Sequence, residues 1–107
     1  MKQSVLIVDD KNTNLIALES TLSELDINVM FATSGLDALN TLLKHDVSLV
    51  LMDVQMPGMD GFEVASFMRR RRKTEKTPII FVSAIHQNED YEFKGYETGC
   101  VDFVFKP

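Results

Sequence analysis

Short apolar segments alternate along this chain with longer segments in which apolar residues recur every three or four positions. The apolar segments are strand-sized and span residues 4–8, 29–32, 49–52, 79–82 and 102–105. The longer segments between them have the spacing of helices that bury one face. Strands alternating with helices are typical of βαβ units, so the pattern predicts an open α/β fold with a parallel sheet.

Polar residues next to the leucines predict where the first two helices begin. Asn12 or Thr13 can cap the first helix, and Thr33 or Ser34 can cap the second. The segment 26–28 is predicted to turn the chain into the second strand. We expect both helices to bury their leucines, which are Leu15, Leu18, Leu22 and Leu25 in the first and Leu36, Leu39, Leu42 and Leu43 in the second.

The second half of the chain repeats the alternation. Turn residues over 57–61 precede a third helix with Phe62, Ala65 and Met68 inward, and a short fourth helix is expected from Asn88 or Glu89 up to Gly99. The segment 49–52 is apolar on both faces, as expected for a central strand covered by helices on each side.

Four of the apolar segments end on residues that phosphoryl chemistry uses. Asp9 and Asp10 follow the first segment, Asp53 the third, Ser83 the fourth and Lys106 the fifth. Open α/β sheets bind their ligands outside the carboxyl ends of the strands. If these strands are parallel neighbours, the carboxylates, the hydroxyl and the ammonium gather along one edge of the sheet.

Carboxylates gathered in this way repel one another unless a cation lies between them. Two unit charges about 4 Å apart interact by roughly 4 kcal/mol at a surface-like dielectric. Mg²⁺ prefers octahedral oxygen sites and is commonly held by one or two carboxylates together with water and phosphate. Asp53 is then both a metal ligand and a candidate nucleophile, because a carboxylate oxygen can attack phosphorus to form an acyl phosphate. Ser83 and Lys106 would each contact a phosphoryl oxygen.

These residues lie within longer matching segments. They are Leu-Ile-Val-Asp-Asp over 6–10, Leu-Met-Asp-Val-Gln-Met-Pro-Gly-Met-Asp-Gly over 51–61, Pro-Ile-Ile-Phe-Val-Ser-Ala over 78–84 and Asp-Phe-Val-Phe-Lys-Pro over 102–107. In order and spacing the chain resembles a receiver domain of a two-component response regulator. The resemblance implies a flavodoxin-like, doubly wound sheet of five parallel strands in the order 2-1-3-4-5. It also implies that Asp53 takes a phosphoryl group from the phosphohistidine of a histidine kinase or a histidine phosphotransfer protein.

The resemblance further assigns a Mg²⁺ site. Asp10, Asp53 and the backbone carbonyl of Gln55 would bind the ion, and Asp9 would support it through water. Ser83 and Lys106 would bind the phosphoryl oxygens.

A switch follows from the same resemblance. Ser83 would move toward the phosphoryl group, and Phe103, three residues before Lys106, would swing inward behind it. Many relatives have tyrosine at that position, whereas phenylalanine has no hydroxyl that needs a partner. The bond between Lys106 and Pro107 would be cis.

Composition limits the setting and the partners. The chain has 107 residues, 45% of them hydrophobic, and a net charge of −5, which suit one globular domain. No segment is long enough to span a bilayer, no secretory leader is evident, and the single Cys100 agrees with a reducing compartment, so we expect a cytoplasmic location and no membrane partner. Six of the eleven basic residues lie between Arg69 and Lys76, where cations suit a helix end. Nucleic-acid binding is not expected, because the rest of the surface is acidic.

Other functions compete with the receiver interpretation. A flavodoxin-like electron carrier would need a hydroxyl-rich phosphate loop, where this chain has Asp-Asp-Lys-Asn over 9–12. A phosphatase with an aspartate nucleophile would have an Asp-x-Asp pair on its first strand, whereas the two aspartates here are adjacent. A receiver-like docking module that is never phosphorylated stays open. The leading interpretation is not a conventional enzyme, since it catalyses only its own aspartyl phosphorylation and dephosphorylation.

Receivers normally continue into a fifth helix after the Lys-Pro pair, whereas this sequence ends at Pro107. We therefore expect a receiver domain over residues 1–107 without its C-terminal helix. Uncovered apolar sheet surface favours self-association, so homodimers or larger oligomers are expected. An output domain of the same protein is a further expected partner if the full protein is longer.

Overall fold

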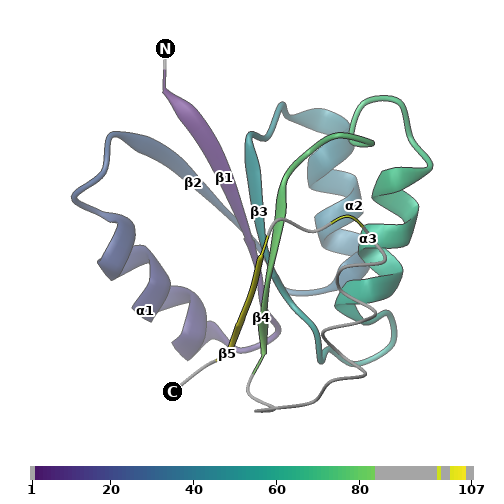
Figure 1. Ribbon diagram of the computed structural model, residues 1–107. Helices are drawn as coiled ribbons and strands as arrows, with labels where there is room; N and C mark the ends of the chain where they lie inside the picture. The colour runs from purple at the N-terminus through teal and green to yellow at the C-terminus, as the bar shows by residue number, and fades with distance from the viewer. Residues whose placement is uncertain (1, 84–98, 100–101, 106–107) are drawn as a thin grey trace.

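The computed structural model describes residues 2–83, 99 and 102–105, and it contains a single parallel sheet (Figure 1). The strands are β1 (Gln3–Val8), β2 (Ile27–Ala32), β3 (Leu49–Asp53), β4 (Ile79–Ser83) and β5 (Asp102–Phe105). Their order across the sheet is β2-β1-β3-β4-β5, and every neighbouring pair is parallel. The predicted doubly wound topology is confirmed.

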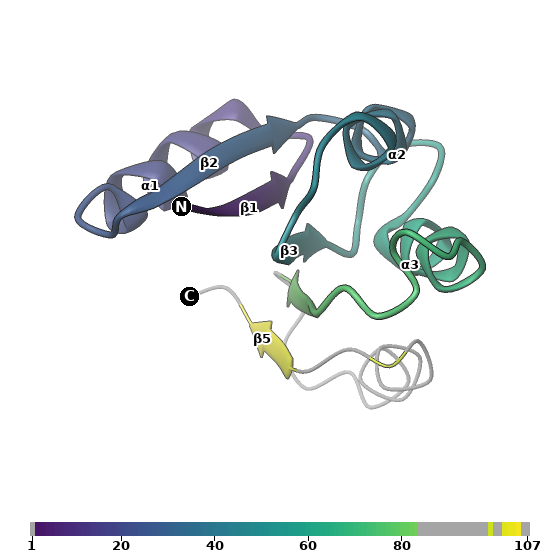
Figure 2. The ribbon, with the colours of Figure 1, turned by 90° about the horizontal axis from the view of Figure 1, so that it is seen from above.

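The described helices lie on both faces of the sheet. α1 (Asn12–Leu22) covers one face near β1 and β2, while α2 (Gly35–Lys44) and α3 (Gly61–Arg69) lie side by side on the other, as Figure 2 shows from above. None of the helices within the described part of the chain is long and apolar enough to cross a membrane.

The core is divided by the sheet into two clusters. The larger lies under α2 and α3 and includes Leu6, Val50 and Phe81, which are fully buried. The smaller lies under α1, where Val5, Ile7 and Leu15 are buried and Leu49 and Leu51 pack against them half-buried. Strand β3 contributes to both clusters, which explains why its sequence has no polar face.

Three of the leucines predicted to be buried are exposed. Leu25 is 56% exposed because α1 ends at Leu22, before that position. In α2 the buried residues are Gly35, Ala38, Leu39 and Leu42, whereas Leu36 and Leu43 are 66% and 54% exposed. Leu36 and Leu43 are seven residues apart and share a helix face, but that face is turned away from the core. The prediction failed because leucine occupies more than one face of this helix.

The helix starts were predicted with mixed success. Ser34 is the N-cap of α2, and its Oγ accepts a hydrogen bond from the Asp37 N–H at 3.1 Å. The N-cap of α1 is Lys11 rather than Asn12 or Thr13, and its side chain makes no capping bond. Its backbone N–H donates instead to the Asp9 carboxylate, so the chain is held just before the helix by the preceding residues.

The remaining boundaries differ in smaller ways. β2 begins at Ile27, so Ile27 and Asn28 lie in the strand opposite β1 rather than in a turn. α3 begins with a capping box between Asp60 and Glu63, and its Ala65 and Met68 are buried as predicted, whereas Phe62 is half-buried. The predicted fourth helix, Cys100, Lys106 and the 106–107 peptide bond lie outside the described residues.

Candidate phosphoacceptor and metal site

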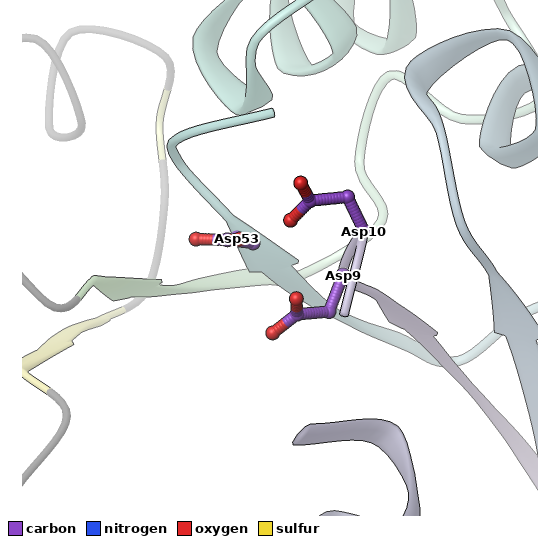
Figure 3. Close-up of side chains that lie close together, drawn as sticks. All are labelled: Asp9, Asp10 and Asp53. Atoms are coloured by element: carbon purple, nitrogen blue, oxygen red, sulfur yellow. The ribbon is translucent and has the colours of Figure 1, made fainter. Parts of the chain in front are cut away.

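The strand register brings three aspartates together at the carboxyl edge of the sheet. Val8, the last residue of β1, pairs with Met52 of β3, so the chain leaves β1 beside the end of β3. Asp9 and Asp10 follow Val8, and Asp53 ends β3 (Figure 3). One carboxylate oxygen from each of Asp9, Asp10 and Asp53 lies within 4.8 Å of the other two. The convergence expected from the sequence is therefore observed for all three carboxylates.

The carboxylate of Asp9 is held by the beginning of α1. Asp9 is 2% exposed, and its Oδ1 accepts a hydrogen bond from the backbone N–H of Lys11 at 2.9 Å. Its Oδ2 accepts a hydrogen bond from Nδ2 of Asn14 at 3.1 Å. Both oxygens thus have protein donors, which fix the orientation of this carboxylate.

Asp10 has a different environment. Its Oδ1 is buried and has no hydrogen-bond partner among the described residues. A buried carboxylate oxygen without a donor is costly unless a cation compensates it. This oxygen therefore fits a cation ligand better than a structural hydrogen bond.

Asp53 lies at the start of the loop 54–60 that joins β3 to α3. Its side chain is buried at 7% exposure, and its Oδ1 accepts a hydrogen bond from the Gln55 N–H at 3.3 Å. The two ends of the loop are joined by the Gly61 N–H, which donates a hydrogen bond to the Val54 carbonyl at 2.9 Å. The exposed Gln55 is thereby kept beside the aspartate cluster.

The structure places the backbone of two further predicted site residues. Val82 pairs with Asp53, and Ser83 ends β4 one residue further on, at the same edge of the sheet. Phe103 lies on β5 opposite the buried Phe81. Their side chains are outside what the structure describes, as is all of Lys106.

The sequence reasoning missed one residue of the site, Asn14. It lies in the first turn of α1 and reaches back to Asp9. Its position next to Leu15, in a turn that faces the strand ends, was the available signal, but the leucine spacing alone does not separate it from an ordinary polar helix residue.

The comparison with known proteins shows the family. A sequence model of the response regulator receiver domain matches residues 5–107. The chain belongs to the receiver domain family. This agrees with the strand order and with the three aspartates at the sheet edge. It also decides against the electron-carrier and phosphatase interpretations.

Individual proteins are similar to this chain over nearly its whole length. The chain is 38% identical over 104 residues to a protein of Vibrio cholerae named probable cyclic di-GMP phosphodiesterase, and 39% identical over 105 residues to the transcriptional regulatory protein AfsQ1 of Streptomyces coelicolor. Each match covers 97% of this chain but only 23% and 44% of the respective relative. The chain therefore spans less than half the length of these two relatives.

Solved structures agree in fold. The chemotaxis protein CheY4 of Vibrio cholerae superposes with a TM-score of 0.93 at 27% identity, covering all of this chain and 88% of the other. The N-terminal domain of a response regulator receiver protein from Methanoculleus marisnigri superposes with a TM-score of 0.87 at 26% identity, over 97% and 84% of the two chains. The chain is thus a receiver domain of two-component signalling with the flavodoxin-like fold.

Proposed function

We propose that Asp53 is the phosphoacceptor of this receiver domain and that a histidine kinase or histidine phosphotransfer protein is its donor. The observation that carries this proposal is the convergence of Asp9, Asp10 and Asp53 within 4.8 Å at the carboxyl edge of the sheet. Asp53 is the member that ends the central strand and starts a loop, where open α/β sheets bind ligands.

The transfer is a nucleophilic substitution at phosphorus. A carboxylate oxygen of Asp53 attacks, a new O–P bond forms, and the P–N bond to the donor imidazole breaks. The imidazole nitrogen keeps the electron pair of that bond. Hydrolysis of the acyl phosphate later returns the free carboxylate and inorganic phosphate, so the domain controls its own signal without acting on a separate substrate.

The residues of the site suit Mg²⁺. The buried oxygen of Asp10, which has no partner in the part of the chain that the structure describes, and the clustering of hard carboxylate ligands support a divalent cation here. Asp10, Asp53 and the backbone carbonyl of Gln55 would hold it. Asp9 would act through water, because both of its oxygens already accept protein hydrogen bonds. When bound, the ion supplies positive charge that reduces the repulsion between the carboxylates and an incoming phosphoryl group.

Ser83 and Lys106 complete the proposed site. The Ser83 hydroxyl and the Lys106 ammonium would bind phosphoryl oxygens, and Ser83 and Phe103 would be the switch pair. The position of Ser83 one residue beyond the partner of Asp53 supports its part in this proposal. Phosphorylation adds about 1.5 to 2 negative charges, which is enough to bias a two-state loop.

The output of the signal belongs to a partner. The two relatives above are longer than this chain, and we propose that this domain likewise regulates an output domain in the same protein or in another. A cytoplasmic location stays a prediction from the sequence.

Intact mass spectrometry tests the phosphoacceptor directly. The protein is incubated with acetyl phosphate or phosphoramidate and Mg²⁺, and we expect a mass gain of one phosphoryl group. Asp53→Asn should abolish the gain. The matched control Asp26→Asn changes an exposed aspartate that pairs with Lys2 far from the cluster, and it should keep the gain. Labelling that survives in Asp53→Asn would disprove the assignment, and an unlabelled wild type would favour the docking-module alternative.

A further inference from the structure

Gly61 is the first residue of α3, and it packs directly on the backbone of Asp53. A Cβ built at this position would lie 2.2 Å from the Asp53 carbonyl oxygen and 3.1 Å from its carbonyl carbon. It would also lie 2.9 Å from Cγ of Met52. Among the described glycines, Gly58 and Gly99 have a positive φ, and Gly61 does not. Glycine is therefore needed here for space and not for backbone conformation.

The same residue closes the loop that carries the proposed metal ligand Gln55. The Gly61 N–H donates to the Val54 carbonyl at 2.9 Å, which joins the two ends of the loop 54–60. Within that loop the Gln55 N–H donates to Oδ1 of Asp53. Gly61 thus touches Asp53 through its Cα and holds the loop beside it through its N–H.

We infer that Gly61 is a positioning residue for the phosphoacceptor site. Its missing side chain allows α3 to begin against the Asp53 backbone, and this contact sets where the Asp53 carboxylate lies relative to Asp9 and Asp10. The inference rests on the proposed function of Asp53.

The expected effect of a side chain is large. A Cβ at 2.2 Å would need to move away by about 1 Å to reach an ordinary contact distance, and the obstacle is backbone rather than the end of a flexible side chain. Mg²⁺ tolerates little departure from octahedral geometry. A displacement of about 1 Å in a reacting group can lower the rate of the reaction by a factor of about 100.

The experiment compares Gly61→Ala with Gly35→Ala. Gly35 begins α2, is buried, and would place a Cβ 2.9 Å from Cβ of Met59 in the loop 54–60 and 3.0 Å from Cγ2 of Val64 in α3. Its substitution therefore crowds two side chains of the same region but does not meet the Asp53 backbone. The Mg²⁺ dissociation constant is measured by calorimetric titration at a temperature where circular dichroism shows each variant folded. We expect Gly61→Ala to weaken Mg²⁺ binding at least tenfold and to slow phosphorylation by acetyl phosphate at least tenfold. Gly35→Ala should stay within threefold of the wild type in both.

A Gly61→Ala protein that binds Mg²⁺ within threefold of the wild type would overturn the inference. If that variant does not fold, hydrogen exchange in the wild type decides. Saturating Mg²⁺ should slow exchange of the Gly61 amide at least tenfold, while the Ala38 amide, bonded to the Ser34 carbonyl in α2, should be unaffected. Unchanged exchange at Gly61 would overturn the inference. A wild type that binds no Mg²⁺ would instead overturn the proposed metal site and the inference with it.

Discussion

At the scale of single residues, the three clustered aspartates have different surroundings. Asp9 is oriented by two donors from the start of α1, whereas Oδ1 of Asp10 is buried without a partner among the described residues. A carboxylate with its donors in place is held in one orientation, whereas a buried carboxylate oxygen without one is suited to a cation. The different roles proposed for these two adjacent aspartates rest on this difference in contacts.

Asn14→Ala should weaken Mg²⁺ binding about tenfold, because residues that orient a metal ligand or its water commonly contribute that much. The free energy of unfolding should change by less than about 1 kcal/mol, since the lost hydrogen bond is offset in part by the higher helix propensity of alanine. Calorimetric titration and urea unfolding measure the two effects. Asn12→Ala, in the same turn of α1, is the control, and equal Mg²⁺ affinities of both variants would contradict the role of Asn14.

Asp10→Asn should stabilise the metal-free protein while removing its response to Mg²⁺. Unit charges within 4.8 Å of one another repel by about 1 to 3 kcal/mol after screening, and the amide removes one of these charges. Urea unfolding in EDTA should therefore show a higher free energy of unfolding than the wild type, and the increase on adding Mg²⁺ should vanish. If Asp10→Asn were less stable than the wild type in EDTA, repulsion between the carboxylates would not be destabilising the metal-free protein.

At the scale of elements, the helices α2 and α3 are fixed by particular polar contacts at their ends. Ser34 caps the start of α2, and the capping box of Asp60 and Glu63 starts α3 next to the site. Arg69 acts at the end of α3, where Nη1 donates to the carbonyls of Thr74, Glu75 and Thr77, and Nη2 donates to the Gly99 carbonyl. Arg69, the first cation of the basic segment 69–76, therefore binds backbone carbonyls.

Ser34→Ala should lower the free energy of unfolding by about 1 kcal/mol, because the Asp37 N–H loses its acceptor. The neighbouring Thr33→Ala is the control and should lower the free energy of unfolding by less than about 0.5 kcal/mol, since an exposed side chain that is not a helix cap contributes little. Urea unfolding at constant pH measures both. Equal losses would show that Ser34 is not the cap that matters in solution.

Arg69→Lys should lower the free energy of unfolding by about 1 to 3 kcal/mol. Lysine keeps the charge but cannot present the planar guanidinium that reaches four carbonyl groups. Arg72→Lys, at an exposed position of the same segment, is the matched control and should change stability by less than about 0.5 kcal/mol. If Arg69→Lys left the free energy of unfolding unchanged in thermal or urea unfolding, the role of the Arg69 guanidinium in fixing the end of α3 would be contradicted.

At the scale of the whole molecule, the described helices cover the two faces of the sheet unequally. α2 and α3 share one face, and α1 is the only described helix on the other (Figure 2). On that second face Ile80 and Val82 of β4 are half-buried, and Val104, which pairs with Val82, is 45% exposed. Apolar sheet surface that is left partly exposed favours association with other molecules.

We therefore expect the protein to self-associate as its concentration rises, as predicted from the sequence. Val104→Lys should shift the population toward monomer in light scattering across a hundredfold range of concentration. Leu43→Lys, which alters an exposed leucine of α2 on the opposite side of the sheet, should have no such effect. A wild type that stays monomeric over the whole range would reject the prediction.

Much of this molecule could be predicted from its pattern of residues. Alternating strands and helices predicted the parallel sheet, and the polar residues at the strand ends predicted the cluster of Asp9, Asp10 and Asp53. The exposure of Leu36 and Leu43 and the hydrogen bond from Asn14 could not be predicted in the same way. They depend on which face of a helix meets the sheet, and leucine spacing alone leaves that undecided.

The sequence by itself therefore determined the class of fold and the chemical groups at the sheet edge, because strand periodicity and strand ends are local properties. The tertiary structure decided how those groups differ. Only the folded chain brings the beginning of α1 to Asp9, leaves an oxygen of Asp10 without a donor from the described residues, and packs Gly61 on the backbone of Asp53. The meeting of Asp9 and Asp10 with Asp53 depends in addition on the register of β1 and β3, and register is set by the packing of the whole sheet.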